Sequence, residues 1–150
     1  MSAGHRKSEG PYPSMEADRL ETLSSYRIMD SRPEKAFDRI AQLAADIFSA
    51  PMASISLIDD DREWFKSAVG FTAVQANRDV SLSAGMIGGH ELLVIEDIEK
   101  EPQFASSPLV SGETSLRFYA GTPLLAPNGK VLGALWIGDT VPRSGVAENQ

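Results

Sequence analysis

Residues 117–139 read RFYAGTPLLAPNGKVLGALWIGD, and this segment constrains the fold more than any other part of the chain. Two apolar runs flank a Pro-Asn-Gly sequence at residues 127–129. That sequence suits a type I turn followed by a left-handed glycine, which is a common three-residue hairpin loop. The segment therefore predicts a β-hairpin.

The turn type also predicts the register of the hairpin. Ala126 faces Lys130, and the same register places Arg117 opposite Asp139 as a charged pair. One face is then expected to lie under helices and carries Phe118, Ala120, Leu124, Leu132 and Trp136. The other face is the candidate wall of a pocket and carries Arg117, Tyr119, Ile137 and Asp139.

Two helices are predicted before the first strand. The first begins near Met15, where Leu20 and Leu23 recur at helical spacing. The second follows Ser31, with Pro33 in the first turn and Glu34 three residues after the serine, as in a capping box. Its apolar side chains recur every three or four residues and predict one apolar face, made of Phe37, Ile40, Leu43 or Ala44, and Ile47.

A pair of strands follows. Residues 52–58 alternate, with Ala53, Ile55 and Leu57 on one side and Ser54 and Ser56 on the other. The three aspartates at 59–61 suit a turn, because neighbouring residues do not supply the alternating ligand spacing of a calcium loop. Residues 62–70 form the returning strand.

The stretch between residues 71 and 116 is irregular. A short helix is predicted near 80–87, ended by two glycines, and a short strand is predicted in ELLVIED at 91–97. Asp97 is expected to cap the turn that follows. Long, partly ordered segments in a compact domain often carry function.

Composition excludes several classes of function. The chain has 150 residues, which suits one domain, and a formal net charge of −7, which disfavours nucleic acid and anionic membranes as partners. No run approaches the roughly 18 apolar residues of a membrane span. The N-terminus has no apolar signal region, so a cytoplasmic location is expected. Because there is no cysteine, thiol chemistry of every kind is absent, and the two histidines cannot form the usual zinc sites.

Several stretches together resemble the GAF domains of bacterial signalling proteins, which often precede histidine kinase or diguanylate cyclase modules. They are LSSYRIMDSRPEKAFDRIAQLAADIF, ISLIDDDREWFKSAVG, RDVSLSAGMI, HELLVIEDIEKEPQFASSPLVSG and LRFYAGTPLLAPNGKVLGALWIGDTVPR. The resemblance implies an α+β fold: an antiparallel sheet of five or six strands, helices on one face, and a pocket on the other that irregular segments cover. The helix that usually closes the domain has no counterpart in TVPRSGVAENQ.

Positions at which the sequence departs from the family pattern reduce the number of ligand classes that the domain could bind. Ser83 stands where similar domains carry a cysteine, and Trp136 stands at a second cysteine position. Covalent bilin attachment and the cysteine chemistry of the free methionine-R-sulfoxide reductases of this fold are therefore excluded. Haem is disfavoured because His90 is the one histidine within the expected domain.

The resemblance implies a sensory or regulatory domain that is not an enzyme and binds an unidentified small molecule. No catalytic triad, carboxylate pair, phosphate loop or metal cluster is visible in the sequence. The alternative is a ligand-free dimerisation or interaction module, since an uncovered helix-side face favours a homodimer. We expect a disordered tail at 1–14, the domain at 15–143 and a polar tail at 144–150. Eight candidate pocket residues follow from the alternation of side chains along the strands and from position in the irregular segment. They are Ser54, Ser56, Ser83, Met86, Phe104, Arg117, Tyr119 and Asp139.

Overall fold

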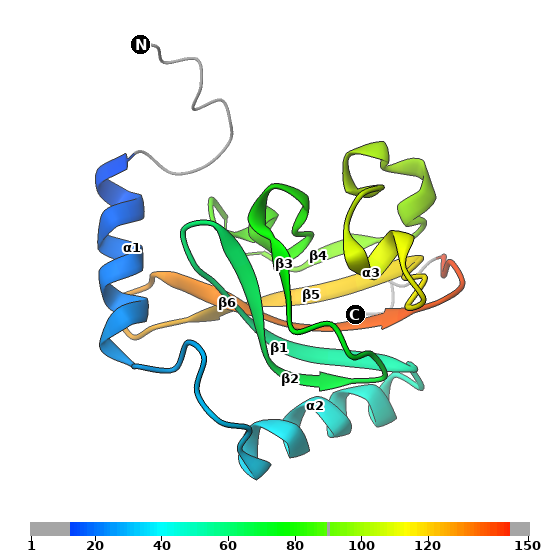
Figure 1. Ribbon diagram of the computed structural model, residues 1–150, viewed down its shortest axis with the longest axis horizontal. Helices are drawn as coiled ribbons and strands as arrows, with labels where there is room; N and C mark the ends of the chain where they lie inside the picture. Colours follow the sequence, from blue (N-terminus) through cyan, green and yellow to red (C-terminus); the bar gives the residue numbers. More distant parts are fainter. Residues whose placement is uncertain (1–12, 90, 145–150) are drawn as a thin grey trace.

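The computed structural model describes residues 13–89 and 91–144, which form one six-stranded antiparallel sheet (Figure 1). The strand order is β3-β2-β1-β6-β5-β4. The strands are β1 (Met52–Ile58), β2 (Arg62–Val69), β3 (Gln75–Asn77), β4 (Leu93–Ile95), β5 (Phe118–Leu125) and β6 (Val131–Asp139). The long hairpin β5–β6 pairs through β6 with β1, so the two strongest sequence signals form the centre of the sheet.

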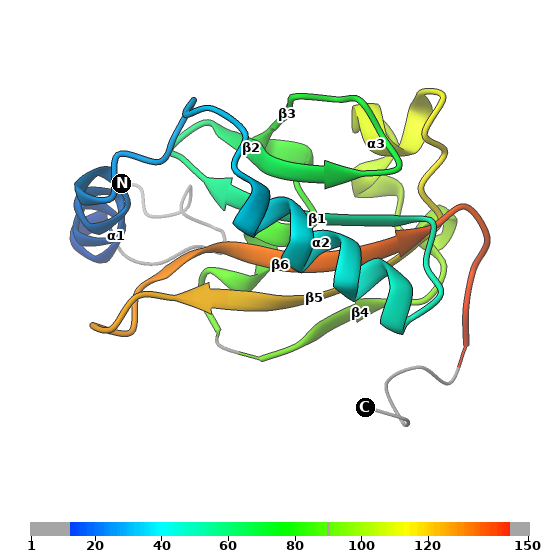
Figure 2. The same cartoon turned by 90° about the horizontal axis from the view of Figure 1, so that it is seen from below.

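The two faces of the sheet carry different layers. Helix α2 (Lys35–Ile47) crosses one face, and α1 (Pro13–Ser25) stands at the end of the sheet near the β5–β6 turn (Figures 1 and 2). On the opposite face, residues 78–89 and 96–117, which we call the crossover, pack over the strands. The crossover contains the short helices η2 (Arg78–Val80), η3 (Ser83–Met86), η4 (Ile98–Lys100), η5 (Pro102–Phe104) and α3 (Pro108–Ser111). This arrangement confirms the predicted fold class.

Several boundaries differ from the sequence prediction. Helix α1 begins at Pro13, within the expected tail, and residues 1–12 and 145–150 lie outside the described residues. The single helix expected near 80–87 is two 3-10 turns, η2 and η3. Helix α3 was missed; Ser107 caps it by accepting a hydrogen bond from the Leu109 amide. Asp97 caps η4 as predicted.

The predicted capping box of α2 is wrong. The helix begins at Lys35, after Pro33, and the Ser31 hydroxyl donates to the Ile28 carbonyl at 2.6 Å. Ser31 is needed elsewhere because Lys66, at a bulge of β2, is buried and requires oxygen partners. Its ammonium donates to Ser31 Oγ at 2.7 Å and to Glu34 Oε2 at 2.6 Å.

The predicted core face of α2 is also wrong. The side chains that α2 buries against the sheet are Ala41 and Ala45, which pack with Ala53, Phe118 and Ile137 of the strands. Small side chains let the helix approach the sheet closely. The large aliphatic side chains of the helix point away from the sheet, as discussed below.

The hairpin turn forms as predicted, but the register changes beyond it. The Ala126 amide donates to the Lys130 carbonyl at 2.9 Å, which is the expected pairing. A bulge between Leu124 and Leu125 then shifts the pairing by one residue, so that Ala120 faces Ile137. A register shift of one residue exchanges the two faces of a strand.

Because of this register shift, the predicted division of the hairpin side chains between the two faces of the sheet is partly wrong. Phe118 and Ala120 lie under α2 as predicted, but Trp136 lies on the crossover face with Tyr119, and Ile137 lies under α2. The Trp136 and Tyr119 rings are 5.4 Å apart. Gly121 is required between them, because a Cβ there would lie 2.6 Å from the Tyr119 hydroxyl oxygen.

The predicted Arg117–Asp139 ion pair does not form. The Arg117 amide donates to the Asp139 carbonyl at 2.8 Å, but the shifted register makes Phe118, and not Arg117, the cross-strand partner of Asp139. The side chains, however, pair with other residues. Arg117 Nε lies 3.3 Å from Glu99 Oε2, and a nitrogen of Arg143 lies 2.8 Å from Asp139 Oδ2.

Candidate functional site

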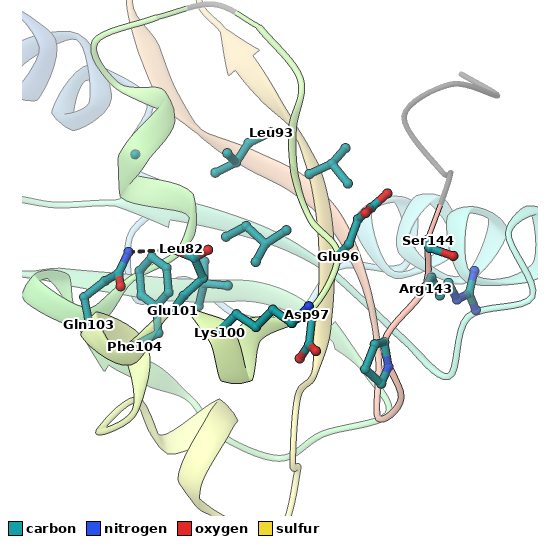
Figure 3. Close-up of a pocket in the computed structure, with 14 residues that line it drawn as sticks. Leu82, Leu93, Glu96, Asp97, Lys100, Glu101, Gln103, Phe104, Arg143 and Ser144 are labelled. Atoms are coloured by element: carbon teal, nitrogen blue, oxygen red, sulfur yellow. Dashed lines mark hydrogen bonds between the residues drawn. The ribbon is translucent and has the colours of Figure 1, made fainter.

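A cleft of about 790 Å³ opens beside β4, between that strand and the crossover. Its lining has an apolar part formed by Leu82, Leu93, Ile95 and Phe104 (Figure 3). Pockets for small organic molecules usually measure about 300–1,000 Å³ and are mainly apolar with a few polar groups. The cleft is within this range of size.

Polar side chains line the remainder of the cleft. Asp97, Lys100 and Glu101 come from the η4 region, and Arg143 closes the far end (Figure 3). Arg143 is held firmly: it pairs with Asp139 and donates to the backbone carbonyls of Phe48 and Ser49. The cleft therefore offers charges of both signs beside an apolar surface.

A buried polar cluster lies inside the crossover face of the sheet. We call it the Glu63 cluster, and it comprises Ser56, Glu63, Ser81, Ser83, Tyr119 and Trp136. Glu63 is 2% exposed, and its Oε1 accepts a 2.7 Å hydrogen bond from the Ser81 hydroxyl. The hydroxyl groups of Ser83 and Tyr119 share a hydrogen bond of 2.6 Å. These bonds tie the crossover to β2 and β5.

The cluster is not fully satisfied. Glu63 Oε2, Ser56 Oγ and Trp136 Nε1 are buried and have no hydrogen-bond partner among residues 13–89 and 91–144. Such groups are rare in folded proteins because each costs free energy. Burial raises the pKa of the Glu63 carboxyl, although the nearby Ser56, Ser81, Ser83 and Trp136 oppose the shift. Burial, together with the charge of Glu63, raises the pKa of Tyr119 well above its ordinary value.

One segment contributes to both the cleft and the cluster. Within residues 81–85, Ser81 and Ser83 bond into the Glu63 cluster, whereas Leu82 and Gly85 line the cleft. A molecule in the cleft would therefore contact the same short segment whose serines hold Glu63 and Tyr119. The sheet behind it supplies an aromatic group in which Phe71 stacks on Trp136 at 5.5 Å.

The eight nominated residues fall into three groups. Phe104 lines the cleft, and Ser56, Ser83 and Tyr119 belong to the Glu63 cluster. The remaining four are held in structural contacts. Ser54 donates to the Ser67 carbonyl at 2.7 Å, Met86 is buried in the core, Arg117 pairs with Glu99, and Asp139 pairs with Arg143.

Sequence reasoning missed Glu63, Ser81 and most of the cleft lining. Glu63 had a readable signal, since it alternates with Phe65 along β2 and so shares that residue's inward face. The cleft residues on β4 and η4 had none, because their position depends on how the crossover folds. Among residues 13–89 and 91–144, no group of three or more acidic or histidine side chains is placed to hold a metal ion. His90, the possible haem ligand, lies outside the described residues.

Replacing Tyr119 with phenylalanine should lower the free energy of unfolding by about 1–3 kcal/mol, because Ser83 then becomes a buried hydroxyl without a partner. Urea unfolding measures the loss. The double variant with Ser83→Ala removes both partners and should lose less than the sum of the single variants. If the double variant lost as much stability as the two single variants together, the hydrogen bond between Ser83 and Tyr119 would not contribute to stability.

No helix in the described part of the chain is long and apolar enough to span a membrane.

The GAF domain family matches residues 32–148. A curated relative, a cyclic di-GMP phosphodiesterase of Pseudomonas aeruginosa, is 34% identical over 138 residues. The match covers 92% of this chain but only 24% of that protein.

Solved structures give the same fold. A putative GAF sensor protein from Burkholderia vietnamiensis aligns with a TM-score of 0.62 at 14% identity, covering 91% of this chain and 84% of that one. The GAF domain of a phosphoenolpyruvate-protein phosphotransferase from Acinetobacter aligns at 0.59 with 21% identity, covering 90% and 84%. By family match and fold together, this chain belongs to the GAF domain family.

Proposed function

We propose that this GAF domain is a non-catalytic sensory domain that binds a small organic molecule in the cleft beside β4. The observation that carries the proposal is the cleft itself, which combines an apolar lining with polar groups from η4. Segment 81–85 supplies a way to report binding, since it also holds the Glu63 cluster. No catalytic role is assigned to Glu63, because only 2% of its surface is exposed.

The relative from Pseudomonas aeruginosa suggests a setting for such a domain. That protein is named as a cyclic di-GMP phosphodiesterase, and this chain matches a quarter of it. We propose that the domain regulates an attached signalling module, such as one that makes or degrades a cyclic dinucleotide, or a histidine kinase. The bound molecule would then alter the output of that module.

A thermal-shift screen with cyclic nucleotides and other small metabolites tests the ligand proposal. A molecule that binds only the folded domain should raise the unfolding temperature progressively with its concentration. Retention of a small molecule through purification, detected by absorbance and native mass, would support the same conclusion. A panel that leaves the unfolding temperature unchanged at every concentration would count against it.

A second candidate function is an interaction module that binds no ligand. A specific observation favours it: the outward face of α2 carries large apolar side chains that lie in solvent. Large exposed apolar surfaces commonly mark sites of protein association. The two functions are compatible, because none of the residues that line the cleft belongs to α2.

A further inference from the structure

Helix α2 exposes its bulky side chains and buries its small ones. Ile40, Leu43 and Ile47 are 49%, 58% and 65% exposed, whereas Ala41 and Ala45 are buried against the sheet. An amphipathic helix at the surface of a monomer normally shows the reverse arrangement. The spacing of the three exposed residues, three and then four apart, is that of a coiled-coil seam. We call these three residues the α2 stripe.

Two opposite charges flank the α2 stripe on one side. Arg39 precedes Ile40, and Asp46 precedes Ile47, so the two charged residues are seven positions apart on the same flank. Both side chains are exposed, and no salt bridge within the described residues involves either one. Asp46 accepts only a hydrogen bond from Gln42, at 3.0 Å.

This pattern is complementary to itself when two copies of the helix run antiparallel. A two-fold axis near Leu43 places Ile40 against Ile47 of the partner subunit. The same axis brings Arg39 beside Asp46 of the partner subunit, and the pair occurs twice by symmetry. In a parallel arrangement the charged flank of each helix would lie against the opposite flank of the partner helix, which carries Ala44, so Arg39 and Asp46 would find no opposite charge. The charges therefore select one orientation.

The other flank of the α2 stripe is apolar. A groove of about 310 Å³ runs between α2 and the strands β5 and β6 and is lined by Ala44, Phe48, Leu92, Leu135 and Ile137 among others. Figure 2 shows β5 and β4 continuing beyond the edge of α2 on this face. Phe48 and Leu92 are themselves 39% and 44% exposed. An apolar surface thus extends from the helix onto the sheet.

We propose that a second copy of this chain covers this face, with the two α2 helices antiparallel and each Arg39 paired with Asp46 of the partner subunit. The proposal deepens the interaction role given above and does not depend on any ligand. A dimer formed here leaves the residues of the cleft free, because the cleft lining shares no residue with the α2 stripe or with the groove beside it. Binding in the cleft and association through α2 can therefore be measured separately.

Charge reversal tests both the dimer and its orientation. Sedimentation velocity over micromolar to several hundred micromolar concentrations should show a dimer for the unaltered protein. Arg39→Asp or Asp46→Arg alone converts two attractive pairs into two repulsive ones and should weaken the dimer by about tenfold or more. The double variant restores attraction with the signs exchanged and should return to within about threefold of the original affinity.

Leu43→Lys places a charge at the proposed two-fold axis and should abolish the dimer. Val74→Lys is the matched control, since Val74 is 65% exposed, close to the 58% of Leu43, but lies outside α2. Circular dichroism of each variant confirms folding. A monomer at all concentrations, an unaffected Leu43→Lys dimer, or a double charge variant that stays as weak as the single ones would each overturn the proposal. Ligand binding by the Leu43→Lys protein tests the cleft independently.

Discussion

Replacing Trp136 with alanine should lower the free energy of unfolding by about 3–5 kcal/mol, the usual cost of removing a large buried ring. The side chain is 1% exposed and lies at the centre of an aromatic group, 5.4 Å from Tyr119 and 5.5 Å from Phe71. Its removal leaves a cavity between the sheet and the crossover. Urea unfolding of the two proteins measures the loss.

Trp136→Phe is the control for this prediction. Phenylalanine keeps much of the apolar contact and loses only an indole N–H that has no hydrogen-bond partner in the described part of the chain. The phenylalanine variant should therefore retain most of the stability that the alanine variant loses. If the alanine variant lost less than about 1 kcal/mol, Trp136 would not occupy the packed position described here.

Glu63 should make the protein less stable as the pH rises. Burial raises the pKa of its carboxyl above the ordinary value of 4.5, so the folded state keeps a proton that the unfolded state releases. Between the unfolded and folded pKa values, the free energy of unfolding falls by about 1.4 kcal/mol per pH unit. Glu63→Gln, which mimics the protonated acid, should remove this slope. Chemical unfolding measured across the pH range reports the difference.

Glu16 should have the opposite effect on the pH dependence of stability, and its effect should occur at lower pH. Burial raises the pKa of Glu16, but hydrogen bonds and charge from Arg19 and Arg78 outweigh it, so the net pKa is lowered. The stability that Glu16 contributes is lost as the pH falls below its ordinary value, and Glu63→Gln should leave that acid limb unchanged. Glu21→Gln, at an exposed position of α1, serves as the matched control. A Glu63→Gln profile identical to that of the unaltered protein would contradict the buried acid.

The parts of the sheet that depend on short, continuous stretches of sequence could be predicted well. The alternation of residues 52–58 correctly placed Ser54 and Ser56 on one face, and the Pro-Asn-Gly turn formed as expected. The error at Trp136 came from a bulge at Leu124 and Leu125, just before the turn at residues 127–129. A bulge has no strong sequence signature when both flanking residues are leucine. One inserted residue then exchanged the faces of Trp136 and Ile137.

The candidate site was less predictable than the fold, for two physical reasons. Lys66 is buried at a second bulge and binds the side chains of Ser31 and Glu34, so these two side chains do not cap α2. No local sequence pattern indicates this contact. The cleft is formed by β4 and η4 together with the residues near Arg143, which lie far from them in the sequence, and all these segments have little regular structure. Ser83 and Tyr119 were nominated separately, and only the folded chain brings them together.

Ligand uptake by a cleft-blocked variant tests the central claim most directly. Gly85→Leu adds a side chain where the Cβ position is 3.8 Å from Leu93 across the cleft, so it should fill the cleft without disturbing the backbone. Gly88→Leu makes the same change where nothing lies within 4 Å, and it is the matched control. Thermal shift and native mass spectrometry are measured on all three proteins with the same panel of cyclic nucleotides and metabolites.

The account predicts that at least one small molecule binds the unaltered protein and the Gly88→Leu variant, and that Gly85→Leu binds it much more weakly. Binding that is equal in all three proteins, or an unaltered protein that takes up no member of the panel and retains no small molecule from purification, would contradict a ligand site in this cleft.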